Sequence, residues 1–312
     1  MLSFAIRRLL TGMITVFAVS LLSFFVFNAL PGNPAQVMLG LDADQSAIEN
    51  LERELNLDKP VTLRYFYWIG DLLRGDFGFS ISYRKPVIQV IADSLPPTLS
   101  ITLLSIVLTV LISFPLGILS AQKHHKWTDY LITSLSQIGL IIPGFWLGII
   151  FLLIFSVQLN LLPSAGYVSL RVSFFDWLRS IILPSLSLAI ISSAVLIRMI
   201  RNSIIENMNE DYARTATGKG ITQRRVFTKH ILKNAMIPVL SLFGLQVASI
   251  LAGTIIIESV FSIPGMGRLL LYSVQRRDLP VVQGVVIWIA VVTILINFFM
   301  DIIHMAIDPR IR

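Results

Sequence analysis

The chain has 312 residues, of which 55% are hydrophobic and only 14% are charged, with a mean hydropathy of +0.77. This composition is typical of a membrane protein and excludes an ordinary soluble domain, and the absence of cysteine excludes disulfides and thiolate metal sites. The formal net charge of +7 does not predict nucleic-acid binding, because the basic residues alternate with apolar stretches and a positive-inside bias explains them.

Six long apolar stretches predict an all-α polytopic membrane protein with six transmembrane helices. None of these stretches contains Asp, Glu, Lys, Arg or His. Their lengths suit a bilayer, which a helix of roughly 20 residues can cross. In chain order the stretches are Leu9–Leu30, Thr98–Ala121, Tyr130–Leu159, Ile181–Ile197, Met236–Ile257 and Val281–Met300.

Two of the six stretches need a separate interpretation. Leu9–Leu30 is longer than the apolar region of a signal peptide, which has roughly 7–15 residues, so we interpret it as an uncleaved first span. Tyr130–Leu159 is long enough to tilt or bend. Pro143 within it predicts a kink at the point where backbone hydrogen bonding is lost.

A long polar region after the first span predicts a small external subdomain. Residues 31–97 contain nine acidic and six basic residues. Within this region, Ala47–Leu55 and Pro60–Leu73 have helical patterns. The expected organisation is an N-terminal anchor with the first span (1–30), the external subdomain (31–97), and a five-helix core (98–312) that contains a cytoplasmic loop at 198–237.

The distribution of basic residues predicts the orientation of the chain. With both termini inside, the inside segments hold 14 of the 25 Lys and Arg residues, and the two short outside loops hold 5. Shifting the frame by one span would reverse this imbalance. The positive-inside rule therefore predicts cytoplasmic termini.

The polar stretch from Arg198 to Pro238 is the most distinctive part of the chain. It lies between two spans and carries eight Lys or Arg residues. Its pattern predicts a first short helix that Asn209 caps and that stops near Gly220. A second helix is predicted to open near Thr222 and to run up to Pro238.

The first of these helices has a face of small residues. Tyr212, Ala213 and Ala216 fall on one side of the helix. Such a face could allow close approach to the groove of a partner protein. The alternative is a solvated loop that carries positive-inside charge and nothing more.

The residues that a zinc peptidase or an ATP-binding loop would need are missing from this sequence. His124 and His125 are adjacent on a short inside loop, without zinc-peptidase spacing, and are expected to be solvated. Thr217–Gly220 is similar to the end of a phosphate loop, but Ala213 stands where that motif needs Gly, so ATP binding is not expected. Asp301 and His304, at the inner end of the last span, are interpreted as interfacial anchors.

The remaining classes are a pore subunit that depends on a separate motor and an ion-coupled carrier or channel that acts alone. An ion-coupled carrier usually places ionisable groups within its spans, and these spans have none. A membrane enzyme would need a nucleophile or a metal constellation, and neither is evident. A permease without its own energy source would depend on a separate motor.

Polar residues within the spans are candidates for lining a translocation path, although most are expected to pack helices together. The span after the polar loop is favoured, because a displacement of the loop would reach that span first. The candidates are Gln246, Ser249 and Gly253 in that span, together with Gln137.

The order of several short motifs resembles the permease subunits of binding-protein-dependent ABC importers, in the oligopeptide, dipeptide, glutathione and nickel branch. The resemblance covers nearly the whole chain. The polar loop resembles the cytoplasmic coupling loop of these permeases, although its leading Glu-Ala pair is replaced by Arg214-Thr215. The motifs are Leu30–Pro34, Gly75–Gly78, Glu210–Tyr212, Arg214–Ala216, Lys219-Gly220, Arg225, His230, Leu232–Pro238, Pro264–Arg268 and Asp308–Arg312.

The resemblance implies a type I ABC importer permease fold and a place in the bacterial inner membrane. It implies partnership with a second homologous permease, two ATPase subunits or domains that hold ATP and Mg, an external solute-binding protein and membrane lipid. The solute would be a small peptide, glutathione, an opine, nickel or a nickel chelate. An ATPase would dock on the 212–220 helix, and the implied coupling residues are Asp211, Tyr212, Ala213, Arg214, Ala216, Gly220 and Arg225.

Overall fold

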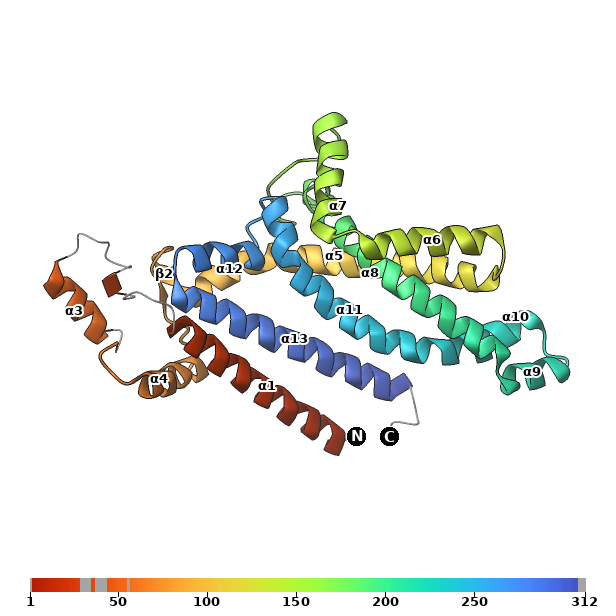
Figure 1. Cartoon of the computed structure of the whole chain (residues 1–312), viewed down its shortest axis with the longest axis horizontal. Coiled ribbons are helices and arrows are strands. Elements are labelled where there is room, and N and C mark those ends of the chain that lie inside the picture. Colours follow the sequence, from red (N-terminus) through yellow and green to blue (C-terminus); the bar gives the residue numbers. More distant parts are fainter. Residues whose placement is uncertain (1, 29–34, 37–43, 55–56, 308–312) are drawn as a thin grey trace. The chain divides into compact units, whose positions relative to one another are not determined.

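The computed structural model describes residues 2–28, 35–36, 44–54 and 57–307, and most of these are helical (Figure 1). The motifs Leu30–Pro34 and Asp308–Arg312, and Leu55 at the end of a predicted helix, lie outside the described residues. The chain forms two compact units. One comprises residues 1–5, 97–264 and 295–312, and the other comprises residues 6–96 and 265–294.

Five described helices are long and apolar enough to cross a membrane, and a sixth crossing results if one bent pair counts as a single span. This confirms the predicted all-α polytopic fold. The five helices are α1 (Leu2–Asn28), α5 (Val87–Gln122), α8 (Phe174–Asn209), α11 (Leu232–Val260) and α13 (Leu279–Ile307). The bent pair is α6 (Trp127–Ile141) with α7 (Gly144–Phe151) and the π-helical turn η1 (Leu152–Gln158).

The helices extend beyond the apolar stretches that predicted them. α5 begins at Val87 rather than near Thr98, and α8 continues to Asn209 rather than ending near Ile197. Apolar residues mark the part of a helix that suits lipid, whereas backbone hydrogen bonding continues into polar sequence. At the start of α8, the hydroxyl of Ser173 accepts a hydrogen bond from the backbone N–H of Asp176 at 3.3 Å and caps the helix.

α8 is the central helix of the first unit, and it is much more buried than the other long helices. Hydroxyl groups join it to α5. Ser105 donates to the carbonyl of Ser185 at 3.2 Å, and Ser193 donates to the carbonyl of Thr109 at 3.3 Å. These bonds confirm that polar residues in these spans pack helices together. Gly117 of α5 lies so close to α8 that an added Cβ would stand 2.8 Å from Ile200 Cβ.

The third predicted span is broken. α6 and α7 meet at an angle of 103°, so the predicted kink at Pro143 is confirmed as a sharp break. Ile142 takes the extended conformation that precedes a proline (ψ 125°), and Pro143 serves as the N-cap of α7. Close to the break, Gly139 approaches α8, where an added Cβ would lie 3.1 Å from Ala194 Cβ.

In the second unit, an aromatic cluster joins α1 to a helix of the polar region. The two short helices of that region are α3 (Gln45–Glu54) and α4 (Val61–Leu73), close to the predicted ranges. Tyr65 of α4 is buried, and its ring lies 5.3 Å from that of Phe24 and 6.2 Å from that of Phe17. Its hydroxyl forms a 2.8 Å hydrogen bond with Ser20 of α1. α4 is therefore fixed to the first span.

A small hairpin completes the second unit. β1 (Phe79–Ser80) pairs antiparallel with β2 (Lys85–Pro86), in the register Phe79↔Pro86 and Ser80↔Lys85. The turn between α12 (Met266–Gln275) and α13 supplies a buried carboxylate, Asp278. Its Oδ2 accepts hydrogen bonds from the Ser80 hydroxyl at 2.7 Å and from the Ser82 backbone N–H at 3.0 Å. This carboxylate holds the hairpin on the helical turn.

Candidate coupling site

The predicted first helix of the polar loop is α9 (Asp211–Gly218). It lies with α10 (Gln223–Arg225) beyond the ends of α8 and α11 (Figure 1). The predicted cap is wrong by one residue, because α8 continues through Asn209 and Glu210 occupies the N-cap position. The side chain of Asn209 instead donates to the carbonyl of Ile205 at 3.1 Å, at the end of α8. Gly220 (φ +79°) reverses the chain after α9 in the left-handed region, as predicted.

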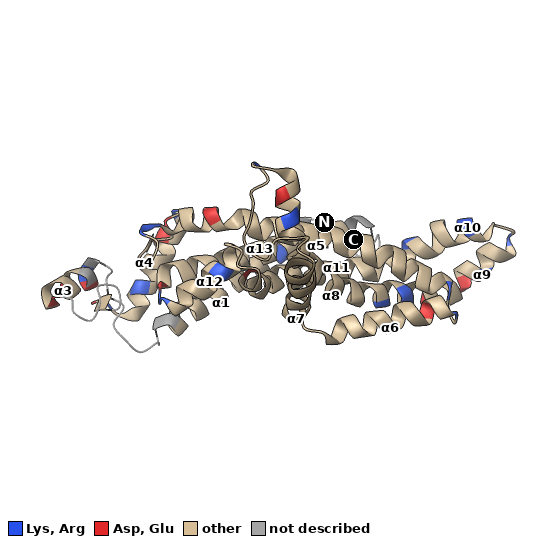
Figure 2. Ribbon diagram, turned by 90° about the horizontal axis from the view of Figure 1, so that it is seen from above, with Lys and Arg blue, Asp and Glu red and all other residues tan. Residues whose placement is uncertain are grey.

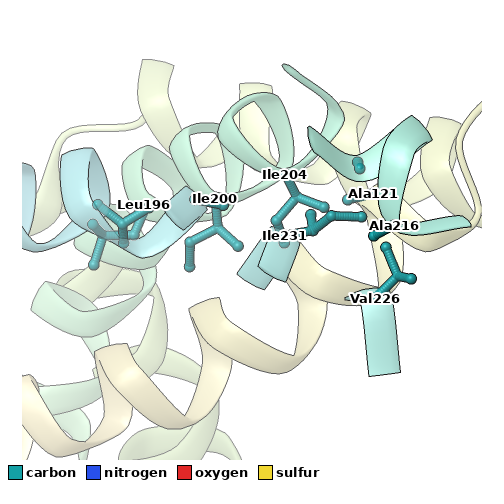
Figure 3. Close-up of a cluster of buried hydrophobic side chains, with 10 residues drawn as sticks. Ala121, Leu196, Ile200, Ile204, Ala216, Val226 and Ile231 are labelled. Carbon is teal, nitrogen blue, oxygen red and sulfur yellow. The ribbon is translucent and has the colours of Figure 1, made fainter. Parts of the chain in front are cut away.

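The small face of α9 packs within this chain. Ala213 and Ala216 are only 4% and 8% exposed, and they belong to a core that includes Ile200 and Ile204 of α8 and Val226 (Figure 3). The prediction of a partner groove for these alanines is therefore wrong. Their small size brings α9 close to α8 and to the turn that follows α10.

The opposite face of α9 is free for contact. Asp211, Arg214, Thr215 and Thr217 are exposed there. Tyr212 lies between the two faces, and its hydroxyl donates to Asn207 Oδ1 at 2.6 Å, which ties α9 to the end of α8. Figure 2 shows charged residues along the α9–α10 end of the chain. A rigidly seated helix with an exposed charged and hydroxyl face can dock on a partner surface.

The second predicted helix is the beginning of a longer one. The helix opens at Thr222, as predicted, although the Thr222 side chain forms no capping hydrogen bond, and a π-helical turn η2 (Val226–Ile231) leads into α11 without a break. Pro238 lies inside α11 and does not end it, which corrects the predicted boundary. Arg225, at the end of α10, is exposed.

A buried ionic cluster at the start of α6 was not predicted. Asp129, at the start of α6, is 1% exposed and accepts two hydrogen bonds from Arg201 of α8, from Nε at 2.6 Å and from Nη2 at 2.8 Å. Ser120 donates to the same carboxylate at 2.6 Å. His124 was expected to be solvated, but its Nδ1 lies 3.2 Å from Asp129 Oδ2. His125 is exposed, although its backbone N–H also donates to Asp129 at 3.2 Å.

This cluster was not evident from the sequence because its two charged residues lie in different segments. Asp129 stands one residue before the apolar stretch that begins at Tyr130, and Arg201 was counted among the charges of the polar loop. The signal available in the sequence was the pair His124 and His125, because these histidines precede Asp129 by only four or five residues. A short turn can therefore bring them close to its carboxylate.

The candidate path residues occupy two different helices. Gln137 is exposed on α6, and Ser249 is exposed on α11 with Gln246 partly exposed beside it. Gly253 has a packing role, because an added Cβ would stand 2.8 Å from Leu188 Cδ2 of α8. Ser249 lies on an exposed stripe of α11 that also includes Leu245, Ala252, Ile256 and Ser259.

No group of three or more His, Asp or Glu side chains within the described ranges is placed to hold a metal ion. The segment Thr217–Gly220 forms the end of α9 and its cap rather than a loop between a strand and a helix, which is the context that a phosphate loop requires.

These features define a multi-pass helical membrane protein with a short helix, α9, that is exposed on one face at the end of a polar loop. Residues 113–312 match the family of the binding-protein-dependent transport system inner membrane component, and residues 1–102 match the N-terminal model of the same membrane component. The chain belongs to this family and is a permease subunit of a binding-protein-dependent ABC importer. It is a multi-pass protein of the inner membrane and is not an enzyme.

Similar proteins match the chain from end to end. The glutathione transport system permease protein GsiC of Escherichia coli (strain K12) is 40% identical over 312 residues, covering 100% of this chain and 99% of the relative. A putative peptide transport system permease protein of Brucella abortus (strain 2308) is 36% identical over the same length and coverage.

Solved structures show the same fold. A chain of the inward-facing MetNI methionine ABC transporter aligns with a TM-score of 0.57 and 16% identity, covering 71% of this chain and 97% of that chain. A chain of an amino acid ABC transporter solved with histidines aligns with a TM-score of 0.53 and 18% identity, covering 70% of this chain and 94% of that chain.

Proposed function

We propose that this permease forms half of a transmembrane pore that imports small peptides, among which glutathione is the first to test. Support for this solute class comes from the full-length relatives, which are named for glutathione and peptide transport. The solute-binding protein outside the cell selects the solute. With a different binding protein, the same kind of permease would carry an opine, nickel or a nickel chelate.

The other half of the pore is a second homologous permease. The described residues of one chain provide six spans at most. If the exposed stripe of α11 that contains Ser249 lines a path for polar solute, another surface must enclose the path on the opposite side. The corresponding surface of a second permease supplies it. Gln246 and Ser249 would face the path, Gln137 would line it from the broken span, and Gly253 would set the position of α11 against α8.

The energy comes from two ATPase subunits or domains that hold ATP and Mg and dock on the coupling site. The exposed face of α9 is the observation that carries this proposal. Asp211, Arg214 and Arg225 would contact the ATPase, while Tyr212, Ala213, Ala216 and Gly220 would hold the helix in position for that contact. Both termini would then be cytoplasmic, on the same side as α9.

The test is reconstitution of the complex. The permease is co-expressed with the homologous permease and ATPase subunits of the same organism, then purified through a tag on this chain and incorporated into lipid nanodiscs. We expect all subunits to co-purify, and we expect ATP hydrolysis that is absent from this chain alone. Uptake of radiolabelled glutathione into proteoliposomes, in the presence of the binding protein, tests the solute. ATP hydrolysis by the isolated chain would contradict the proposal.

A further inference from the structure

The buried pair of Asp129 and Arg201 joins the broken span to the helix that carries the coupling site. Asp129 stands in the first turn of α6, and Arg201 stands about two turns before the end of α8. The two-point contact between guanidinium and carboxylate, with N–O distances of 2.6 and 2.8 Å, fixes both distance and orientation. Ser120, from the last turn of α5, donates to the same carboxylate. Three helix ends therefore meet at one buried anion.

The same segment of α8 also seats the coupling helix. Ile200 and Ile204 flank Arg201 in the sequence and pack in the core that contains Ala213 and Ala216 of α9 (Figure 3). On a helix, Ile200 and Ile204 share one face and Arg201 projects from a different face, so one segment of α8 can hold α9 on one side and α6 on another. A movement of α9 would therefore pass into this segment first.

Apart from this pair, α6 is incompletely packed against α8. A cavity of about 300 Å³ lies among α5, α6 and α8, and Leu135, Ile190 and Ile197 are among the apolar side chains that line it. Gly139, which also lines this cavity, approaches α8 closely near the break at Pro143. Between Asp129 and Gly139, α6 meets α8 mainly through apolar side chains around this cavity, and the attachment at Asp129 is ionic.

We propose that Asp129 and Arg201 are positioning residues for transport, and that their ion pair makes α6 follow the coupling helix when the ATPase moves it. This role rests on the proposed docking of an ATPase at α9. An ionic attachment suits it, because its two-point geometry resists sliding and rotation, whereas the apolar contacts around a cavity do not. The broken span then moves with α8 and α9 as one body.

Spin labels measure this linkage directly. The native chain has no cysteine, so Ser134→Cys on α6 and Lys229→Cys on η2 provide two unique labelling positions, and both are exposed. Distances are recorded in the complete complex with its second permease and ATPases, first without nucleotide and then trapped with ATP and vanadate. In the otherwise wild-type chain we expect one narrow distance that is unchanged by trapping.

The test variants remove one partner of the pair. We expect Asp129→Asn and Arg201→Gln to retain the ATPase and the nucleotide-free distance, because the contact at Gly139 still seats α6. On trapping, their distance should shift or broaden, while ATP hydrolysis stays in the wild-type range. Arg201→Lys, which keeps the charge but loses the two-point contact, should shift less. The exchange Asp129→Arg with Arg201→Asp should restore part of the wild-type behaviour.

Arg198→Gln is the matched control, because it removes the same charge from an exposed position one turn earlier on α8. Three results would overturn the inference. They are a wild-type distance that changes on trapping, test variants that keep the wild-type distance during trapping, and test variants already broadened without nucleotide, which would indicate a purely structural role. Failure of the ATPase to co-purify with the unmutated chain would instead contradict the proposed function.

Discussion

At the scale of single residues, neighbouring positions on α9 differ in whether their side chains are buried in this chain or exposed to a partner. Ala216 is buried against α8 and the η2 turn, whereas Thr215, the residue before it, is exposed. A substitution at Ala216 therefore acts on this chain, and a substitution at Thr215 acts on whatever docks there.

Arginine at these two adjacent positions should have different effects. Ala216→Arg overpacks a core site, which typically costs about 1–3 kcal/mol, with an added cost for burying charge. We expect it to lower the melting temperature of the purified permease. Thr215→Arg should leave that temperature unchanged and should reduce ATPase co-purification. Full ATPase binding and normal uptake by Thr215→Arg would remove the docking role from the exposed face of α9.

Asp278 controls a second local structure. Its carboxylate accepts two hydrogen bonds from the hairpin segment, and hydrogen bonds to charged groups contribute about 1.5–3 kcal/mol each. Asp278→Ala should release the hairpin and expose its backbone to protease near Ser82, as measured by limited proteolysis and mass spectrometry. Asp93→Asn is the control, because Asp93 forms a mostly exposed ion pair with Lys85 and should not change the cleavage pattern.

At the scale of elements, Gly117 and Gly253 bring α5 and α11 equally close to α8, but they meet parts of α8 that differ in their freedom to move. A Cβ at Gly117 would meet the Cβ of Ile200, which cannot move without its helix, together with the carbonyl of Ile197. A Cβ at Gly253 would meet only the end of the Leu188 side chain, which can rotate away.

Alanine should therefore be tolerated at Gly253 and not at Gly117. We expect Gly117→Ala to lower the thermal stability of the permease in detergent by about 1–3 kcal/mol, because α5 must move outward. Gly253→Ala should change stability by less than that, although uptake will report any effect on the neighbouring path candidates. Equal stability of the two variants would show that α5 and α8 separate without cost.

Much of the element structure could be predicted from hydrophobicity, since apolar runs identified every long helix and Pro143 identified the break. The ends of the helices could not, because α8 continues to Asn209 through polar residues that form backbone hydrogen bonds as readily as apolar ones. The orientation of α9 was also missed. An alanine face suits a partner groove or an internal core equally well, and only the positions of Ile200 and Val226 decide between them.

At the scale of the whole molecule, the orientation across the membrane stays a prediction that two cysteines can test. Asp44 is predicted outside and Lys219 inside, and both are exposed in this structure. Because the native chain has no cysteine, Asp44→Cys and Lys219→Cys provide single reporters. A membrane-impermeant maleimide should label only Asp44→Cys in spheroplasts and should label Lys219→Cys after lysis. Labelling of Lys219→Cys in intact spheroplasts would reverse the topology.

The length of α8 has a consequence for the chemical surroundings of the coupling helix. From Ile197, the end of the apolar stretch, to Asn209, α8 advances about 18 Å, at 1.5 Å per residue. The headgroup layer on each side of a bilayer is only about 5–8 Å thick. The remaining distance of about 10 Å exceeds the Debye length of about 8 Å in physiological salt. Exchange of neutral for acidic phospholipids should therefore leave the affinity for the ATPase almost unchanged, whereas added salt should weaken it.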